Sequence, residues 1–510
     1  MRAKKAFRNI ISSLFLQLVT VLCGFVVPKV IISNFGSETN GLITSITQFL
    51  GYISLVEAGV GGVVRAALYG PLAKKDTKQI NKIIKAASVF FKRVAYFSIL
   101  YIVILAVIYP LIALGQFDYW FTFSLVVIIG ISSFAQYYFG ITYQLLLQAD
   151  QKQYVGSLLQ VATLIINMLL VIVMVKLNFG IVAVKIISSL AFIIRPIAIN
   201  LLVKKRYSID LRCEYDKKVL AKKRDGFAHH IAYFLHTNTD IVVLTIFSSM
   251  KDVSVYSIYC MIVTGVRRLV TTFSSGLEAT FGNMLANDEK ENLKSKFNTV
   301  ETFAFLISNT FFVTALVSIE PFMSIYTSGF VDADYQKPVL GVFLIIAEYM
   351  YCIRSPFNSL IIGAGHFKET KKSAYLEAGI NILLSIIFVN VWGINGVAFA
   401  TFIAMTYRTL FYVYYLKRNL IQRSVWIFIG KMLLTLAAGF LSIIVCDLIG
   451  ILSETSGYFD WGLRTFGAFA IIGIINTIFW RLFYAKDFLA MKKIIKSIAR
   501  RIRKKKKVKV

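Results

Sequence analysis

The stretch NMLLVIV at residues 167–173 recurs as NILLSII at residues 381–387, with identity at four of seven positions. A second pair follows at nearly the same offset, FGIVAV at 179–184 and NGVAFA at 395–400. Each copy follows a short loop, lies in a long apolar run and ends at another short loop. The repeat predicts two like-oriented halves, related by an axis along the normal of a membrane.

The composition is that of a membrane protein. Of the 510 residues, 57% are hydrophobic and 16% are charged, and the mean hydropathy is +0.70. Soluble domains carry about 25% charged residues, and a run of about 20 apolar residues crosses the bilayer as a helix. We predict an all-α polytopic membrane protein with about 14 transmembrane helices, at 10–33, 41–64, 94–114, 119–148, 154–175, 181–203, 227–248, 254–280, 298–320, 338–362, 373–391, 396–416, 428–449 and 463–483.

The net charge of +30 is distributed unevenly between the two sides of the predicted membrane. With the N-terminus inside, the inner segments and span borders carry 45 of the 56 Lys and Arg residues, and the outer loops carry 3. This asymmetry predicts cytoplasmic N- and C-termini. The basicity then reflects topology and argues against a nucleic-acid partner.

The predicted spans divide the chain into an N-terminal lobe at 1–203, a basic cytoplasmic linker at 204–226 and a C-terminal lobe at 227–416. Two further helices at 428–483 follow the second lobe. The tail at 484–510 places apolar residues on one helical face and Lys and Arg opposite, which predicts a helix on anionic inner-leaflet lipids. A disordered basic tail that only reinforces topology is the alternative.

Five arginines lie deep in predicted spans, where a guanidinium costs about 2.5–3.5 kcal/mol on insertion scales. We expect Arg267 or Arg268, together with Arg354, to form a cationic cavity between the two halves. Arg195 and Arg408, offset by 213 residues, indicate equivalent positions in the halves. A structural ion pair or an interfacial place is the alternative for these two.

Acidic and polar side chains also fall inside spans. Glu57 and Glu348 are candidates for ion coupling or for lining the cavity, with a salt bridge as the alternative for Glu57. Arg65 and Glu278 lie at the predicted cytoplasmic ends of spans 2 and 8 and are a candidate gate pair. A polar stripe on the seventh span suggests proton coupling, or only the wall of a wet cavity, and consists of His229, Tyr233, His236 and Asp240.

Motifs for catalysis are absent from the sequence. There is no G-x-x-x-x-G-K-[ST] phosphate-binding loop, no H-E-x-x-H and no G-x-S-x-G. The five cysteines are scattered without metal-ligand spacing, so we expect no metal, no cofactor and no catalytic residues. The predicted outer loops are too short for the large loop that a membrane polymerase or ligase often uses, so an enzyme is disfavoured.

The region FGSETNGLITSITQFLGYISLVEAGVGGVVRAALYGPLAKKD, residues 35–76, resembles the Wzx-type flippases of the polysaccharide-transport family, within the multidrug/oligosaccharidyl-lipid/polysaccharide (MOP) exporter superfamily. A glycine follows the first helix, an acidic residue precedes further glycines, and a basic residue closes the second helix. The resemblance extends over essentially the whole chain and implies a MATE/MurJ-like fold, with two six-helix lobes and two extra helices.

The resemblance also implies a function. A cationic central cavity would accept an undecaprenyl-pyrophosphate-linked oligosaccharide and move it across the bacterial cytoplasmic membrane by alternating access. The expected pathways are those of capsule, exopolysaccharide or O-antigen, with a polysaccharide polymerase and a chain-length regulator as partners. A monomer suffices for such a cavity. The alternatives are a small-molecule or multidrug cation antiporter on the same scaffold, and a flippase for a peptidoglycan or teichoic-acid precursor.

Overall fold

A computed structural model describes residues 2–57, 59–113, 115–214, 238–274, 277–451 and 455–493. All regular structure in these residues is helical, which confirms the predicted all-α fold. Twelve helices in the described part of the chain are long and apolar enough to cross a membrane. The first of them, Arg8–Glu57, covers two of the predicted spans, and residues 238–247 form a shorter apolar helix within the predicted seventh span. The number 14 is therefore approximate.

The chain forms two compact units, residues 1–257 with 329–333 and residues 258–328 with 334–510. The predicted lobe boundary at 204–226 lies partly outside the described residues, and the division into lobes stays a prediction. The first unit contains α1 (Arg2–Gly51), α2 (Ser54–Glu57), α3 (Val60–Lys74), α4 (Thr77–Ile112), α5 (Tyr119–Ala135), a π-helix (Gln136–Gly140), α6 (Ile141–Ala149), α7 (Gln153–Lys176), α8 (Ile181–Arg206) and the start of α10 (Met250–Thr272).

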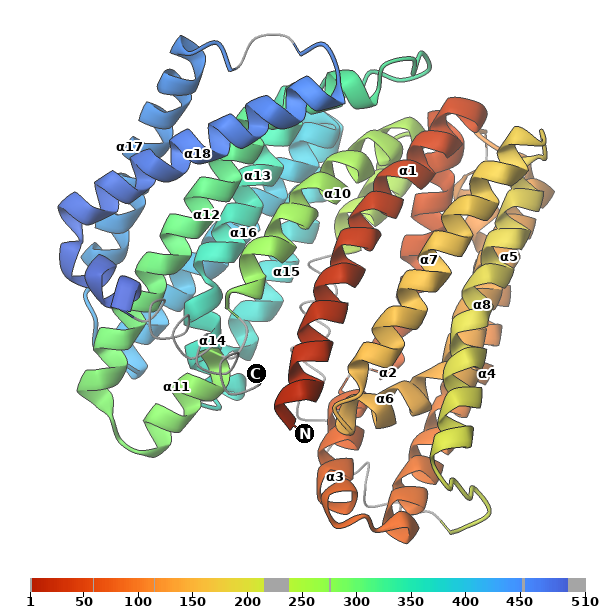
Figure 1. Ribbon diagram of the computed structural model, residues 1–510. Coiled ribbons are helices and arrows are strands. Elements are labelled where there is room, and N and C mark those ends of the chain that lie inside the picture. Colours follow the sequence, from red (N-terminus) through yellow and green to blue (C-terminus); the bar gives the residue numbers. More distant parts are fainter. Residues whose placement is uncertain are drawn as a thin grey trace, which may run out of the picture. The chain divides into compact units, whose positions relative to one another are not determined.

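The second unit contains the rest of α10 and the eight helices that follow it (Figure 1). These are α11 (Leu277–Ala286), α12 (Lys290–Tyr326), α13 (Pro338–Ile353), α14 (Ser355–Gly363), α15 (Phe367–Trp392), α16 (Ile394–Asn419), α17 (Val425–Leu448) and α18 (Tyr458–Phe483). Residues 485–493 are also helical, whereas the remainder of the predicted amphipathic tail lies outside the described residues.

The sequence repeat is present in the structure as a repeated helix pair. In the first unit α7 packs on α8, and Ser188 Oγ donates a hydrogen bond of 2.6 Å to Asn167 Oδ1. In the second unit α15 packs on α16, and Asn381 Nδ2 donates a hydrogen bond of 2.9 Å to Thr401 Oγ1. All four side chains are buried. The asparagine that opens each repeated stretch therefore ties its helix to the next one through a buried hydroxyl.

The predicted first and second spans are joined in α1, and Gly36 marks the joint. Its φ of 85° and ψ of 164° are not helical, so two helices meet at this residue. Such a backbone conformation is essentially restricted to glycine. Ser37 begins the second helix, and its N–H and Oγ–H donate to the Asp332 carboxylate at 2.6 and 2.8 Å. The Asp332 side chain thus caps a helix start whose N–H groups have no intrahelical partner.

Four predicted spans differ from the observed helices. The span expected at 41–64 is interrupted, because α1 ends at Gly51 and Gly59, with a φ of 83°, precedes α3. The span expected at 254–280 ends earlier, at Thr272. The spans expected at 119–148 and 338–362 contain the π-helix and a break at Arg354, respectively. Apolar runs locate the spans, but they do not show where a helix breaks within one.

Candidate functional site: a polar cavity and a buried charge network

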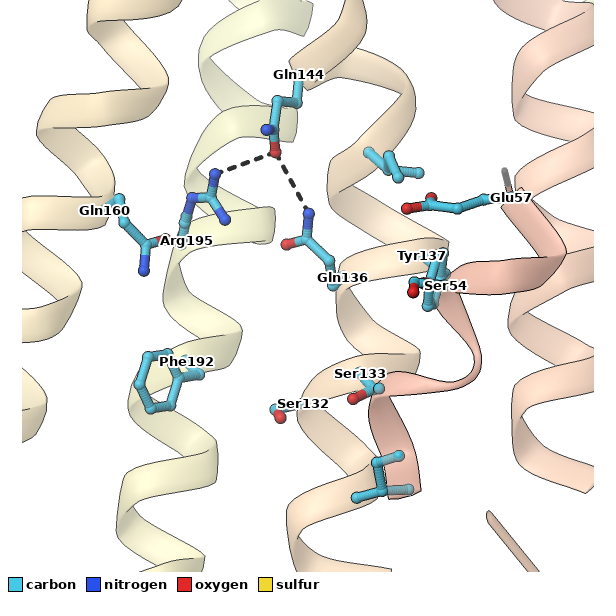
Figure 2. Close-up of a pocket in the computed structure, with 13 residues that line it drawn as sticks. Ser54, Glu57, Ser132, Ser133, Gln136, Tyr137, Gln144, Gln160, Phe192 and Arg195 are labelled. Carbon is cyan, nitrogen blue, oxygen red and sulfur yellow. Dashed lines mark hydrogen bonds between the residues drawn. The ribbon is translucent and has the colours of Figure 1, made fainter. Parts of the chain in front are cut away.

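A cavity of about 450 Å³ lies among the helices of the first unit (Figure 2). Ten of its lining residues are polar or aromatic, or carry a charge. They are Ser54, Glu57, Ser132, Ser133, Gln136, Tyr137, Gln144, Gln160, Phe192 and Arg195, and Leu50, Gly51 and Ile141 complete the wall. The predicted candidates Arg195 and Glu57 therefore line one cavity, together with amides and hydroxyls that the sequence reasoning did not single out.

Irregular helix segments build this cavity. The break after Gly51 brings Ser54 and Glu57 on α2 to one wall, and the π-helix brings Gln136 and Tyr137 to another. π-helical turns are frequent at functional sites, and interrupted helices within a membrane are found where they line a cavity. The third wall is α8, which carries Arg195.

Gly140 at the end of the π-helix allows α8 to come close. A Cβ at this position would lie 2.7 Å from Cβ of Pro196, which no real side chain tolerates. Pro196 directly follows Arg195, so the close approach fixes the height of the guanidinium against the π-helix. Hydropathy does not reveal the π-helix, because its residues, QYYFG at 136–140, sit in an otherwise continuous apolar run.

The cavity holds a cation and a carboxyl group that do not pair with each other. Arg195 Nη2 donates to Gln144 Oε1 at 3.1 Å, and the same oxygen accepts from Gln136 Nε2 at 3.3 Å. Figure 2 shows Glu57 on the opposite wall from Arg195. In the described part of the chain, Arg195 Nε and Glu57 Oε2 are buried without a hydrogen-bond partner. A ligand with both donors and acceptors would satisfy these atoms.

The second unit contains a network of buried charges. Arg267 on α10 pairs with Glu348 on α13 at 2.8 Å, with side chains 15% and 14% exposed. Arg354 pairs with Glu377 on α15 at 2.5 Å, with both side chains 8% exposed. The Tyr351 ring joins the two pairs, because it lies 5.1 Å from the Arg267 guanidinium and 4.9 Å from that of Arg354. Cations over a tyrosine face are held by the quadrupole of the ring.

Arg408 on α16 extends this network. Its Nε lies 3.8 Å from the Glu377 carboxylate, and its Nη2 donates to the Tyr412 hydroxyl at 2.7 Å. Tyr412 in turn donates to Asn358 Oδ1 on α14 at 3.1 Å. Arg354 occupies the residue between α13 and α14, where the helix breaks. For Arg408, the alternative of a structural ion pair thus describes its contacts in this structure.

Arg268 differs from its neighbour Arg267. Its side chain is exposed, and it forms no ion pair with any residue that the structure describes. Because α10 ends at Thr272, the arginine pair lies in the last turns of the helix. The expectation that the pair lies deep in a span is therefore wrong, since the predicted span extends eight residues beyond the end of the helix. Both guanidiniums lie within reach of the headgroup region by snorkelling.

The structure adds acidic partners that the sequence reasoning missed. Glu377 lies ten residues into α15, which begins at Phe367, but the predicted span began at residue 373 and placed Glu377 near its edge. Glu301 on α12 was missed in the same way, and it is fully buried. Its carboxylate pairs with Arg423 and with Lys431 Nζ, the latter at 2.8 Å. A mid-span acid is visible in sequence only when the helix boundaries are known.

The other predicted candidates have the following positions. Asp240 accepts a hydrogen bond of 2.6 Å from the Tyr256 hydroxyl, while His229, Tyr233 and His236 lie outside the described residues. Arg65 donates to Gln148 Oε1 at 2.9 Å, and Glu278 is exposed in the first turn of α11. The gate pair and the proton-coupling stripe stay predictions. Among the described residues, no three His, Cys, Asp or Glu side chains gather as metal ligands would.

Comparison with solved structures shows what this fold is similar to. A lipid II flippase MurJ in an inward closed conformation matches with a TM-score of 0.71 and 16% identity, over 93% of this chain and 98% of that one. An inward-facing MATE multidrug transporter of the MOP superfamily matches with a TM-score of 0.60 and 14% identity, over 79% and 96% of the two chains. A Vibrio cholerae MATE transporter matches at 0.56 and 14%, over 83% and 98%.

These matches show that the chain has the fold of multi-pass flippases and transporters. No protein-family model matches the sequence. No curated protein matches it either. The MATE/MurJ-like fold expected from the resemblance is therefore confirmed, whereas the polysaccharide subtype belongs to the proposal below.

Proposed function

We propose that this protein is a flippase that moves an undecaprenyl-pyrophosphate-linked oligosaccharide repeat unit from the inner to the outer leaflet of a bacterial cytoplasmic membrane, with both termini cytoplasmic. The observation that carries the proposal is the excess of guanidinium groups in the second unit. Four arginines, Arg267, Arg268, Arg354 and Arg408, are accompanied by two carboxylates, those of Glu348 and Glu377. An anionic ligand compensates the remaining charge.

A lipid diphosphate suits this arrangement chemically. Guanidinium groups bind phosphate oxygens through charge-assisted, bidentate hydrogen bonds, and these are strong where water is scarce. Arg268 is exposed and without an acidic partner among the described residues, and the Arg267–Glu348 pair is more exposed than the Arg354–Glu377 pair. The diphosphate therefore meets Arg268 and Arg267 first, and the deeper arginines hold Tyr351 and α14 in place.

The choice of substrate class follows from the sign of the charge. A transporter for cationic drugs would need carboxylates to outnumber guanidiniums, and the network in the second unit has the opposite balance. A flippase for a peptidoglycan or teichoic-acid precursor would use the same diphosphate chemistry, and the match to the MurJ structure favours that second candidate equally well. The sugar distinguishes the candidates, so the experiment must identify it.

The test is to delete the gene in its host and determine on which leaflet lipid-linked saccharide accumulates. The proposal expects complete oligosaccharide units on the inner leaflet and loss of surface polymer, with peptidoglycan synthesis intact. Complete units on the outer leaflet would exclude translocation and point to a later step. Inner-leaflet accumulation of a peptidoglycan precursor would establish the second candidate. Unchanged saccharide with increased drug sensitivity would establish the antiporter.

A further inference from the structure

The two halves of the chain allow Arg195 to be compared with its own counterpart. Arg195 lies 14 residues after the start of α8, and Arg408 lies 14 residues after the start of α16; both helices have 26 residues. The buried Asn167–Ser188 and Asn381–Thr401 bonds fix the register between the halves. The same repeat therefore places an arginine at the same height in each unit.

The surroundings of the two arginines differ. Arg408 is buried beside the Glu377 carboxylate of α15 and bonds to Tyr412. The offset between Asn167 and Asn381 matches Glu377 to Thr163 on α7, which has no charge. It also matches Asn358 to Gln144, and Gln144 is the residue that accepts from Arg195. The first unit thus keeps the arginine and its amide but lacks the carboxylate.

A cavity takes the place of the missing carboxylate. Arg195 lines the cavity of about 450 Å³, within the roughly 300–1,000 Å³ of small-molecule sites. Its Nε is buried and has no hydrogen-bond partner in the described part of the chain. Glu57 forms no ion pair with it there, so the protein supplies no counter-charge from the opposite wall. An anionic group entering the cavity would fill the role that Glu377 fills in the other half.

The remaining walls carry the chemistry that recognises a sugar. Gln136, Gln160, Ser132 and Ser133 offer amide and hydroxyl groups, and Tyr137 and Phe192 offer aromatic surface. The buried Glu57 Oε2 is an acceptor for a ligand hydroxyl or amide N–H. A second cavity of about 100 Å³ shares Gln144 and Arg195 and adds Gln148, Gln153 and Ser157 to the polar surface. An apolar drug would leave these groups unsatisfied.

We propose that this cavity is a saccharide subsite that binds an acidic sugar, with the sugar carboxylate at Arg195 and its hydroxyls on the amides, serines and Glu57. This deepens the proposed function and rests on it: the diphosphate binds at the arginines of the second unit, and the repeat unit carries at least one uronic-acid-type residue. The anion at Arg195 has two sources to distinguish, the sugar carboxylate and the carrier diphosphate.

The experiment measures ligand contact with the purified full-length protein by saturation-transfer NMR, which detects millimolar affinities. The probes are glucuronate, glucose and inorganic pyrophosphate, alone and in competition. The proposal expects saturation transfer to glucuronate, with glucose bound about tenfold more weakly because the charge-assisted bond is missing. It also expects that pyrophosphate does not displace glucuronate.

Two variants test the assignment to Arg195. Arg195→Gln should weaken glucuronate binding about tenfold. Thr163→Glu installs the carboxylate of the other half, and it should block glucuronate if the variant folds, as judged by its thermal unfolding. Arg464→Gln, which removes a guanidinium that pairs locally with Asp460 on α18, is the matched control and should bind glucuronate as the natural protein does.

The outcomes that overturn the proposal are specific. Equal binding of glucose and glucuronate, no binding of either, or unchanged glucuronate binding in Arg195→Gln would each exclude an acidic-sugar subsite at Arg195. Displacement of glucuronate by pyrophosphate would assign the anion site to the carrier. Translocation of a fluorescent lipid-diphosphate saccharide in proteoliposomes is measured separately, because its loss would refute the flippase and not the subsite alone.

Discussion

Arg354 and Glu377 form the most buried ion pair that connects the interrupted helix α13–α14 to α15, with Nη1 and Oε1 2.5 Å apart. Arg354 sits at the residue between the two helix segments, so its guanidinium fixes the break in position. Burial lowers the local dielectric and strengthens the attraction, but it also makes an unpaired charge costly.

Removing one member of this pair should destabilise the protein more than removing both. Arg354→Gln or Glu377→Gln leaves a buried charge without its partner, at a cost of about 3–5 kcal/mol. The double variant should recover part of this loss, although Arg408 retains a share of the Glu377 field in the single variant. Thermal unfolding of the four proteins in detergent gives the coupling energy directly. Additive losses would contradict the direct pairing.

Gly36 should not tolerate a side chain. Its φ of 85° and ψ of 164° belong to a region that costs other residues about 1–3 kcal/mol, and a Cβ would lie 3.1 Å from the Asp332 carboxylate. Gly36→Ala should therefore lower the unfolding temperature, and Asp332→Ala should lower it by the smaller amount of a lost helix cap, about 1 kcal/mol. Gly51→Ala is the control, because a Cβ at Gly51 would have nothing within 4 Å. An unchanged Gly36→Ala melting curve would refute the joint at this residue.

The fold was largely predictable from the sequence because burial in lipid imposes long apolar runs. The recurrence of Asn167 and Asn381 in matching apolar stretches revealed the repeat, and the structure gives its physical meaning as two buried bonds, Asn167–Ser188 and Asn381–Thr401. The equivalence of Arg195 and Arg408 followed from the same offset. Hydropathy was thus sufficient for the helices and for the register between the halves.

The candidate site was less predictable because it depends on where helices break. Hydropathy windows average over the break near Gly51 and the π-helix at Gln136–Gly140, so the cavity that these segments form was not foreseen. Glu377 appeared peripheral until the start of α15 was known, and without Glu377 the charge on Arg354 and Arg408 was overestimated. Side-chain partners across helices require the tertiary packing, which a single sequence does not encode in any local pattern.

Transport should depend on the exposed arginine more directly than on the buried ones. If Arg268 contacts the diphosphate, Arg268→Gln removes charge-assisted bonds worth about 1.5–3 kcal/mol and slows translocation about ten- to hundredfold, with little change in thermal stability. Lipid-linked saccharide flipping in proteoliposomes, compared with Arg464→Gln, measures the effect. Normal flipping by Arg268→Gln together with Arg267→Gln would exclude these residues from the substrate site.

Asp150, which follows α6, should make the stability of the first unit depend on pH. It accepts from Lys5 at 3.0 Å and from the Tyr207 hydroxyl at 2.5 Å, and it pairs with Lys152 at 2.6 Å. Burial raises the pKa of Asp150, but the hydrogen bonds from Lys152, Tyr207 and Lys5 outweigh it and hold the pKa below its ordinary value. The same environment raises the pKa of Tyr207, chiefly through burial and then through the Asp150 carboxylate.

Because the folded pKa of Asp150 is depressed, its contribution to stability is fully present above the unfolded value of about 3.9 and is lost as the pH falls through the folded value. These side chains are partly exposed, so the contribution is about 1 kcal/mol. Asp150→Asn should therefore unfold more easily than the natural protein at pH 7, and the two should converge in acid below both pKa values. Thermal unfolding across this pH range checks the prediction, with Asp447→Asn, a carboxylate at the end of α17 with no ion pair among the described residues, as the control. A constant difference between Asp150→Asn and the natural protein at every pH would mean that the Asp150 carboxylate contributes through packing rather than through its charge.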